Sequence, residues 1–309
     1  MGYKKLRLLV KFETPYVTPL LADTIFGEFC WALCWLKGED KLKEILNHEK
    51  PIGFSDLMPK GKLPFPKYPK EPLYFSPRTP KDYEITKEFK KKRLLEKDIF
   101  KECVGKGKSL EGFLNCVKEC LLRGEKKEGG AKKDSATLTS VHVSINRITG
   151  TASEGKLYHL KENFVEEGEI YAVYNEELLS EEDIVEVFNV LGLTGIGAKK
   201  SSGKGKFKVK LLDWDLPAVR EKEWFISLST GLPKACEVDK YYADFFTKFP
   251  KHGKEVASPK IFKKPVILSR PGSVFRARKR LELYGELKEG VSYFTGHKHS
   301  FLVVPLFVG

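Results

Sequence analysis

The segment 195–206 combines glycine, serine and lysine residues in a pattern that suits contact with phosphate groups. Glycine lacks a Cβ atom, so it lets backbone N–H groups approach a phosphate closely. Serine hydroxyls donate hydrogen bonds, and lysine ammonium groups neutralise charge. The candidate residues are Lys199, Lys200, Ser201, Ser202, Gly203, Lys204 and Lys206. We expect them to bind the backbone of single-stranded RNA without a metal ion or a nucleotide.

Two nucleotide-binding motifs are excluded for this segment. Five residues separate Gly197 from Gly203, and Gly205 stands where a P-loop has Ser or Thr after its lysine. A P-loop also runs from a strand to a helix, whereas this segment runs from a predicted helix to a predicted strand. Lys200 stands at the third glycine of the dinucleotide pattern. The alternative, a flexible connector kept soluble by lysine, stays open.

Histidines and a tyrosine could support acid–base chemistry on RNA. Cleavage without a metal needs a general base and a general acid near the scissile 2′-hydroxyl. The candidates are His142, His159, His297 and His299, with Tyr158. Each could instead have no catalytic role, as a residue of a strand, of the end of a hairpin or of a surface turn before the last strand. Metal-dependent cleavage would need carboxylates that converge on a metal ion, and we expect no such site and no catalytic residue.

Four of the six cysteines have helical spacing. Cys30 and Cys34, like Cys116 and Cys120, are four residues apart. Four such cysteines could in principle hold zinc. Cys30 and Cys116 also continue apolar helical faces, which favours reduced, buried thiols in a cytosolic protein. We therefore expect no metal site and no cofactor.

The charge of the chain favours a polyanionic partner. Its 309 residues include 55 Lys and Arg against 42 Asp and Glu, a formal net charge of +13. Of the basic residues, 45 are lysine and 10 are arginine, and lysine lacks the bidentate fork that suits base edges. This balance favours neutralising phosphates over reading duplex bases. No apolar run approaches the roughly 18 residues of a membrane span, so we expect a cytoplasmic protein with no membrane partner.

The N-terminal elements are a strand and an unusually apolar helix. Residues 3–12 have the pattern of a strand, and residues 21–36 have helical spacing, with Asp23 or the following threonine as the N-cap. This helix is apolar nearly all round, which is typical of a buried helix or an interface helix. We expect Trp31 and Trp35 to contact a protein partner.

Two long segments separate this helix from the middle of the chain. Residues 51–80 hold eight of the 17 prolines and are expected to be extended and poor in strands. Residues 81–123 are expected to be helical, with a break at 105–109. Residues 124–136 lack core-forming side chains and are expected to form a mobile loop.

The middle third has clearer patterns. The expected elements are strands over 139–148, 157–164 and 169–175, a turn-rich tip over 149–156, a helix over 180–193 and a strand over 207–214. Ser180 and Asp183 resemble a capping box. The order strand–helix–insert–strand–strand–helix–strand is that of a ferredoxin-like split βαβ unit, the fold that RRM domains use.

We therefore expect an α+β protein with two ferredoxin-like (RRM-like) domains, the second more irregular than the first. The first covers residues 1–215, with a large insert near 51–136 and a hairpin near 146–158. The second covers residues 216–309, with several strands and one helix near 239–249.

The combination of motifs resembles the RAMP proteins of CRISPR systems, which have RRM-like folds and a glycine-rich loop after the second helix of the first domain. LADTIFGEFCWAL (21–33) is similar to the opening helix of the small type III RAMP subunits. INRITGTASEGKLY (145–158) is similar to their strand–hairpin–strand element, and SRPGSVFRARK (269–279) resembles their Gly-Ser-x-Phe turn. In this order the motifs resemble the fourth subunit of type III-A (Csm) effector complexes, which caps the 5′ end of the CRISPR RNA (crRNA).

The resemblance implies a non-catalytic scaffold for antiviral defence. Such a subunit holds the crRNA 5′ tag and joins the large polymerase-cyclase subunit to the backbone subunit of the Csm filament. The hairpin would act as a thumb beside the guide–target RNA duplex, with Arg147 and Thr149 in contact with RNA. In the C-terminal domain the resemblance assigns RNA contacts to Ser273, Phe275, Arg276 and Arg278.

Two other classes of function stay open. Some RAMP relatives are metal-independent endoribonucleases that process crRNA, and the histidines named above would serve such an enzyme. The basic charge would also suit an interaction protein, or a protein of membrane surfaces, that ignores RNA.

Overall fold

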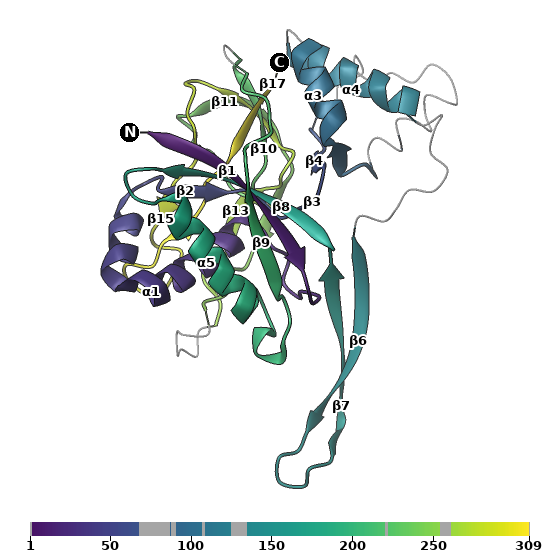
Figure 1. The fold of residues 1–309 in the computed structure, drawn as a ribbon, viewed down its shortest axis with the longest axis vertical. Coiled ribbons are helices and arrows are strands. Elements are labelled where there is room, and N and C mark those ends of the chain that lie inside the picture. Colours follow the sequence, from purple (N-terminus) through teal and green to yellow (C-terminus); the bar gives the residue numbers. More distant parts are fainter. Residues whose placement is uncertain are drawn as a thin grey trace.

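The structure, a computed structural model, describes residues 2–67, 87, 91–106, 109–124, 135–219, 222–253 and 261–308. It combines helices with antiparallel sheets, and one long hairpin projects from the body (Figure 1). This agrees with the expected α+β class. Most of the loop expected at 124–136, and the proline-rich segment from residue 68 to residue 80, lie outside the described residues.

The first sheet has the strand order of a split βαβ unit. It contains β1 (Tyr3–Phe12), β2 (Ile52–Phe54), β3 (Met58–Pro59), β8 (Glu167–Asn175) and β9 (Phe207–Leu212). The order is β2-β8-β1-β9 with antiparallel neighbours, and β3 also pairs with β8. The second strand of this unit thus comes from the proline-rich segment, which was expected to be poor in strands. It pairs there because β8 offers a free edge that local sequence does not reveal.

Two helices cover one face of this sheet. They are α1 (Ala22–Asn47) and α5 (Glu181–Thr194). Alternate β1 residues, among them Leu8 and Val10, point into the core that these helices close. The helix α1 runs beyond the predicted end at 36, but its geometry breaks at Gly38, which has φ +85°.

The N-termini of these two helices are capped in different ways. The predicted capping box of α5 is present, because the Ser180 hydroxyl accepts from the Asp183 backbone N–H and the Asp183 side chain accepts from Ser180. The N-cap prediction for α1 is wrong. The first N–H of α1, on Ala22, donates instead to Oδ1 of Asp56, at 2.9 Å. Asp23 is buried and paired with Lys248, with Nζ 2.6 Å from Oδ1.

A second sheet repeats the strand order of the first without its helices. It contains β10 (Trp224–Ser227), β11 (Val238–Tyr242), β14 (Val274–Ala277) and β17 (Pro305–Val308), in the antiparallel order β11-β14-β10-β17. In the described residues after 222 no helix is present. The helix expected near 239–249 is wrong, because β11 and β12 (Phe245–Lys248) occupy that segment. Aromatic residues there pair across strands rather than along a helix face.

Smaller pieces complete this half of the chain. The strand β12 pairs with β13 (Val266–Ser269), and β15 (Leu287–Lys288) pairs with β16 (His299–Ser300).

The two sheets share one hydrophobic core. Tyr171 and Val173 on β8 face Ile226, Val274 and Leu306 of the second sheet. The helices α3 (Lys97–Lys106) and α4 (Leu110–Gly124) close this core, together with the strands β4 (Lys62–Pro64) and β5 (Leu94–Glu96). The strand β8 is consequently buried on both faces.

A buried charge cluster lies where α3 begins. Lys97 Nζ lies 2.6 Å from Glu169 Oε2 and 3.0 Å from Asp215 Oδ2. Arg7 contacts the same two carboxylates, at 2.9 and 2.7 Å, and the Tyr171 hydroxyl donates to Asp215 at 3.1 Å. Each buried charge has an opposite partner, as burial requires. The cluster fixes the insert helices to β1 and β8.

The projecting hairpin is a two-stranded antiparallel sheet of β6 (Ala136–Ile145) and β7 (Ala152–Phe164) (Figure 1). At its base, Asn163 of β7 also forms a β-bridge with Tyr16. Its turn is tighter than the tip expected at 149–156. The Asn146 side chain accepts from the Ile148 N–H at 2.9 Å, and Gly150 adopts φ +69°. These local contacts close the turn by Thr151 and leave the following residues to β7.

Candidate RNA-binding surface

The lysine-rich segment 195–206 forms a compact loop rather than an open connector. It leaves α5 at Gly195 and enters β9, and one short 3₁₀ turn spans Lys200–Ser202. The Ile196 N–H donates to the Gly205 carbonyl at 3.0 Å, which closes the loop at its neck. A Cβ atom on Gly205 would lie 2.3 Å from the Ile196 carbonyl oxygen, so this closure needs glycine.

Two of the four loop lysines are paired with carboxylates. Lys200 Nζ lies 3.0 Å from Glu28 Oε2 on α1, and Lys204 Nζ lies 2.7 Å from Glu162 Oε2 on β7. Both lysines are largely buried in these contacts. They hold the loop between the helix layer and the hairpin, which reduces their availability to phosphate groups.

The other two lysines present their charge to solvent. Lys199 Nζ contacts the Tyr158 hydroxyl at 3.3 Å, and Lys206 is exposed, with no carboxylate within ion-pair distance in the described part of the chain. Ser201 and Ser202 are exposed beside them. The structure therefore divides the predicted residues into a free set and a set that positions the loop.

The base of the hairpin lies against this loop. Glu162 is 2% exposed; it accepts from Lys204 at 2.7 Å and from the Ser140 hydroxyl at 2.6 Å. The hydrogen bond from Lys204, aided by that from Ser140, lowers the pKa of Glu162 below its usual value. An ionised Glu162 thus ties the loop to the hairpin. Sequence reasoning missed this residue, because nothing local marks its partner.

The tip of the hairpin is separate from the loop. Arg147 and Thr149 are exposed at the turn, and the Thr149 hydroxyl lies 2.8 Å from that of Thr151. Neither residue contacts the 195–206 loop. Both faces of β6, which leads to Arg147, are largely exposed.

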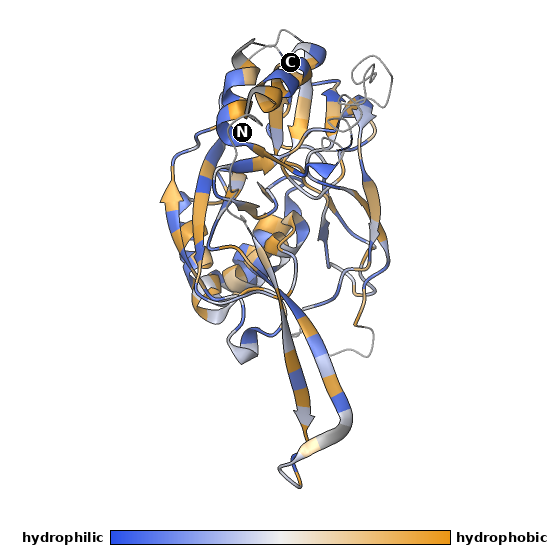
Figure 2. Ribbon diagram, turned by 90° about the vertical axis from the view of Figure 1, so that its right-hand side faces the viewer, coloured by the Kyte–Doolittle hydropathy of each residue, from blue (hydrophilic) through white to orange (hydrophobic). Residues whose placement is uncertain are grey.

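One face of the hairpin is apolar and open to solvent. Val141, Val143 and Ile145 alternate along β6, and Leu157 lies opposite Val143. All four are more than 40% exposed, and Ile148 at the turn is 95% exposed. Figure 2 shows apolar residues along the projecting strands. An exposed apolar face of this kind marks a contact surface.

The C-terminal residues assigned by resemblance lie in different environments. Ser273 and Phe275 are buried, and the Ser273 hydroxyl donates to the Arg270 carbonyl at 2.7 Å. Neither side chain is accessible to RNA here, so both are left out of the candidate surface. Arg276 pairs with Asp239 on β11, with Nε 2.7 Å from Oδ1. Arg278 is exposed, and its Nε donates to a backbone carbonyl at 3.2 Å.

The tryptophans of α1 lie beside the loop. Trp35 is 49% exposed, and the ammonium of Lys200 lies 5.7 Å from its ring centroid. Trp31 is partly buried. Half of the Trp35 surface is thus open for contact with a further molecule.

The candidate acid–base groups are dispersed. His142 stacks on Tyr158 with ring centroids 5.4 Å apart, and its Nε2 lies 2.9 Å from the Ser140 hydroxyl. His299 was expected in a surface turn, but it is buried, and burial lowers its pKa to about 4. It is therefore neutral at pH 7 and lies 3.4 Å from Asp23. Of these groups, Tyr158 contacts the lysine loop through Lys199, with His142 stacked on it.

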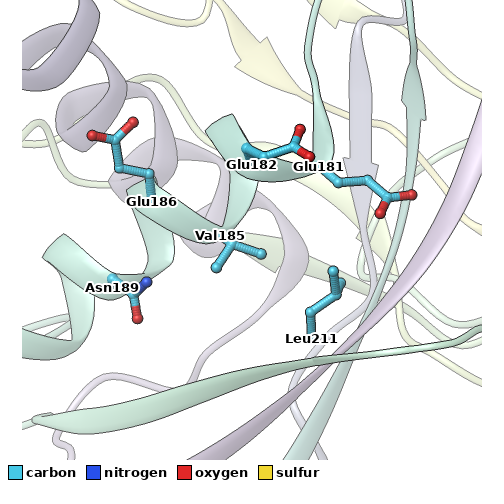
Figure 3. A pocket seen from close by; sticks show the side chains of 6 residues that line it. All are labelled: Glu181, Glu182, Val185, Glu186, Asn189 and Leu211. Atoms are coloured by element: carbon cyan, nitrogen blue, oxygen red, sulfur yellow. The ribbon is translucent and has the colours of Figure 1, made fainter.

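A hollow of about 390 Å³ lies between α5 and β9, away from these groups. Its lining includes the carboxylates of Glu181, Glu182 and Glu186 (Figure 3). Negative charge repels phosphate, so we assign no RNA contact to it. None of the helices in the described parts of the chain combines the length and the apolar character that a membrane span requires.

Comparison with known proteins finds similarity in structure but not in sequence. No protein-family model matches the chain, and no curated protein matches it. A chain in the crystal structure of a Csm1–Csm4 cassette in complex with cA4 is 15% identical with a TM-score of 0.57, and the match covers 99% of this chain and 98% of the other. A chain in the crystal structure of a Csm3–Csm4 subcomplex of the type III-A CRISPR-Cas interference complex is 14% identical with a TM-score of 0.57, covering 98% and 100%.

Csm4 is the component that these two complexes have in common. A third similar chain, 17% identical with a TM-score of 0.54, comes from a Csm1–Csm4 cassette in complex with AMPPNP, and that match covers 99% and 98% of the two chains. The chain thus has a Csm4-like fold over nearly its whole length. The resemblance found in the sequence is confirmed at the level of the fold.

Proposed function

We propose that this chain is a crRNA-binding scaffold subunit of a type III-A CRISPR-Cas interference complex. In this proposal its two sheets are two ferredoxin-like units, and it joins a Csm1-like large subunit to a Csm3-like backbone subunit. The observation that carries the proposal is the Csm4-like fold in which a compact loop with exposed lysines lies against the base of a projecting hairpin.

The chemistry of the loop supports binding to the RNA backbone. Lys199, Lys206 and the two exposed serines offer charge and hydrogen-bond donors, which suit phosphates of any sequence. In RNA-guided complexes base pairing supplies the sequence specificity, and the protein holds the backbone. We propose that this loop holds the 5′ tag of the guide.

The hairpin supports a second contact. Its apolar face, with Val143 and Leu157, could lie against bases, while Arg147 at the turn could stack on a base or clamp a phosphate. We propose that this face lies beside the duplex of guide and target RNA. The role of Arg147 and Thr149 stays a prediction.

Co-purification tests the proposal directly. The chain is expressed with Csm1-like and Csm3-like partners, and the RNA that elutes with the assembly is sequenced. We expect short RNAs that share one 5′ end derived from a CRISPR repeat. RNAs without a common 5′ end, or an assembly that omits this chain, would contradict it.

Trp35→Glu is expected to disrupt a contact with a partner protein. Trp35 is half exposed, so the variant is expected to keep its melting temperature within about 3 °C, as surface changes rarely exceed about 0.5 kcal/mol. Its yield in co-purification with the partner subunits is expected to fall at least about tenfold, because a tryptophan that becomes buried in an interface is a common anchor of binding. Leu193→Glu, at an exposed position on α5, is the matched control. An unfolded Trp35→Glu variant would show that the tryptophan belongs to the core.

A metal-independent endoribonuclease is the second candidate, favoured by the cluster of His142, Tyr158 and Lys199. We propose that the chain is nevertheless not an enzyme. The rings of His142 and Tyr158 stack face to face at 17°, which leaves no position between them for a scissile phosphate.

Purified chain is therefore expected to leave labelled repeat RNA intact in the presence of EDTA, as measured on a denaturing gel. His142→Ala and His159→Ala are assayed beside it. Cleavage that disappears in His142→Ala and persists in His159→Ala would establish the enzyme instead.

A further inference from the structure

The insert helices α3 and α4 bring together three thiols that are separated in the sequence. The Sγ atoms of Cys103, Cys116 and Cys120 all lie within 4.8 Å of one another. Cys103 comes from α3 and is buried, and the other two come from successive turns of α4 and are half-buried. Among the described residues, this is the one group of three ligand-type side chains that could hold a metal ion.

The spacing of these sulfur atoms suits a thiolate-bound metal. Tetrahedral zinc with Zn–S bonds of about 2.3 Å places its sulfur ligands about 3.8 Å apart. The Cys103 and Cys120 sulfurs are 3.8 Å apart. The zinc-ligand geometry therefore needs only small side-chain rotations, whereas a disulfide would need the two sulfurs to approach to about 2.05 Å.

The other cysteines do not join this group. Cys30 and Cys34 belong to α1, where Cys30 packs against the first core, and Cys236 is exposed in the C-terminal half. The pairing of Cys30/Cys34 with Cys116/Cys120 that their equal spacing suggests is therefore wrong. In the folded chain, Cys103 joins Cys116 and Cys120 in place of Cys30 and Cys34.

We propose that Cys103, Cys116 and Cys120 bind one zinc-class divalent ion that clamps α3 to α4. Each thiol releases its proton to solvent as it binds the ion, so the site carries three thiolates. Three protein ligands leave one coordination position, which water takes from the half-exposed side of α4. The rings of Phe100 on α3 and Phe113 on α4 have centroids 5.5 Å apart. This contact already packs the two helices together beside the three thiols.

A metal titration of the full chain tests this proposal. The protein is stripped with a chelator under a non-thiol reductant and titrated with Co²⁺, which reports thiolate ligands by their charge-transfer absorption, and then with Zn²⁺. We expect one Co²⁺ per chain, displaced by Zn²⁺. Cys116→Ser is expected to weaken Zn²⁺ binding by more than about 100-fold, because loss of even an outer partner costs about 10–100-fold. Cys34→Ser and Cys236→Ser are the matched controls and should bind like the parent.

Alkylation of the unmodified chain gives a readout that needs no variant. Zn²⁺ is expected to protect Cys103, Cys116 and Cys120 from iodoacetamide, and to leave the labelling of Cys236 unchanged, as measured by mass spectrometry. Absence of Co²⁺ binding, equal Zn²⁺ affinity in Cys116→Ser, or a disulfide between Cys103 and Cys120 in the isolated protein would each overturn the proposal.

Discussion

Asp56→Ala is expected to lower the free energy of unfolding by about 2–6 kcal/mol, because it leaves two buried N–H groups without an acceptor, at about 1–3 kcal/mol each. Asp56 is buried and accepts from the Ala22 N–H at 2.9 Å and the Thr230 N–H at 2.6 Å. Its second oxygen accepts from the Thr230 hydroxyl at 2.7 Å. One side chain thus caps α1 and holds the second half of the chain to the first.

Asp56→Asn is the matched control. Both N–H groups donate to the same oxygen, Oδ1, so an asparagine carbonyl can accept both. Its amide can donate to the Thr230 hydroxyl in place of the contact to Oδ2. Denaturant unfolding of the three proteins at neutral pH measures the effect. An alanine variant as stable as the parent would contradict the role assigned to Asp56.

The difference in stability between the parent and Asp56→Asn is also expected to depend on pH. Burial raises the pKa of Asp56 from 3.8 to about 6, although hydrogen bonds from Thr230 and Ala22 oppose the rise. Between these values the folded chain retains a proton that the unfolded chain has released. The stabilising contribution of this carboxyl is therefore complete below about pH 4 and is lost as the pH rises through 6, by about 3 kcal/mol. The parent should lose stability relative to Asp56→Asn over this window.

Lys199→Ala combined with Lys206→Ala is expected to weaken binding of single-stranded RNA and to flatten its salt dependence. Each lost phosphate contact removes about 0.7 from the slope of log affinity against log salt, so the slope should fall by about 1.4. These are the two loop lysines without a carboxylate partner in the described residues. Affinity measured by fluorescence anisotropy at several salt concentrations gives the slope.

Lys41→Ala combined with Lys43→Ala removes the same charge from α1, where both lysines pair with neighbouring acids. We expect this control to keep the parent slope. An unchanged slope in the loop variant, or an equal fall in both variants, would show that the loop makes no local phosphate contacts. Lys200 and Lys204 are unsuitable for this test, because their removal would leave Glu28 and Glu162 without their partners.

Local sequence determined the elements whose signals lie within a few residues. The capping box of Ser180 and Asp183, the apolar periodicity of α5 and the length of β1 were all predictable, because neighbours in the chain supply the contacts that form them. The exposure of the loop serines follows in the same way from a turn rich in glycine. The Csm4-like fold was predictable from the order of such motifs along the chain.

Contacts between distant residues could not be predicted in this way. The strands β11 and β12 replaced an expected helix because their partners, β14 and β13, come later in the chain. A strand owes its stability to such cross-strand neighbours, so its own sequence is a weak guide.

By itself the sequence determined that 195–206 is a lysine-bearing loop between a helix and a strand, and that four of the six cysteines have helical spacing. Only the tertiary structure decided which lysines remain free, because the partners of Lys200 and Lys204 are 172 and 42 residues away. It likewise decided that Cys103 joins Cys116 and Cys120, since this needs α3 to pack on α4. Charge and thiol chemistry act through distance in space, and folding alone sets those distances.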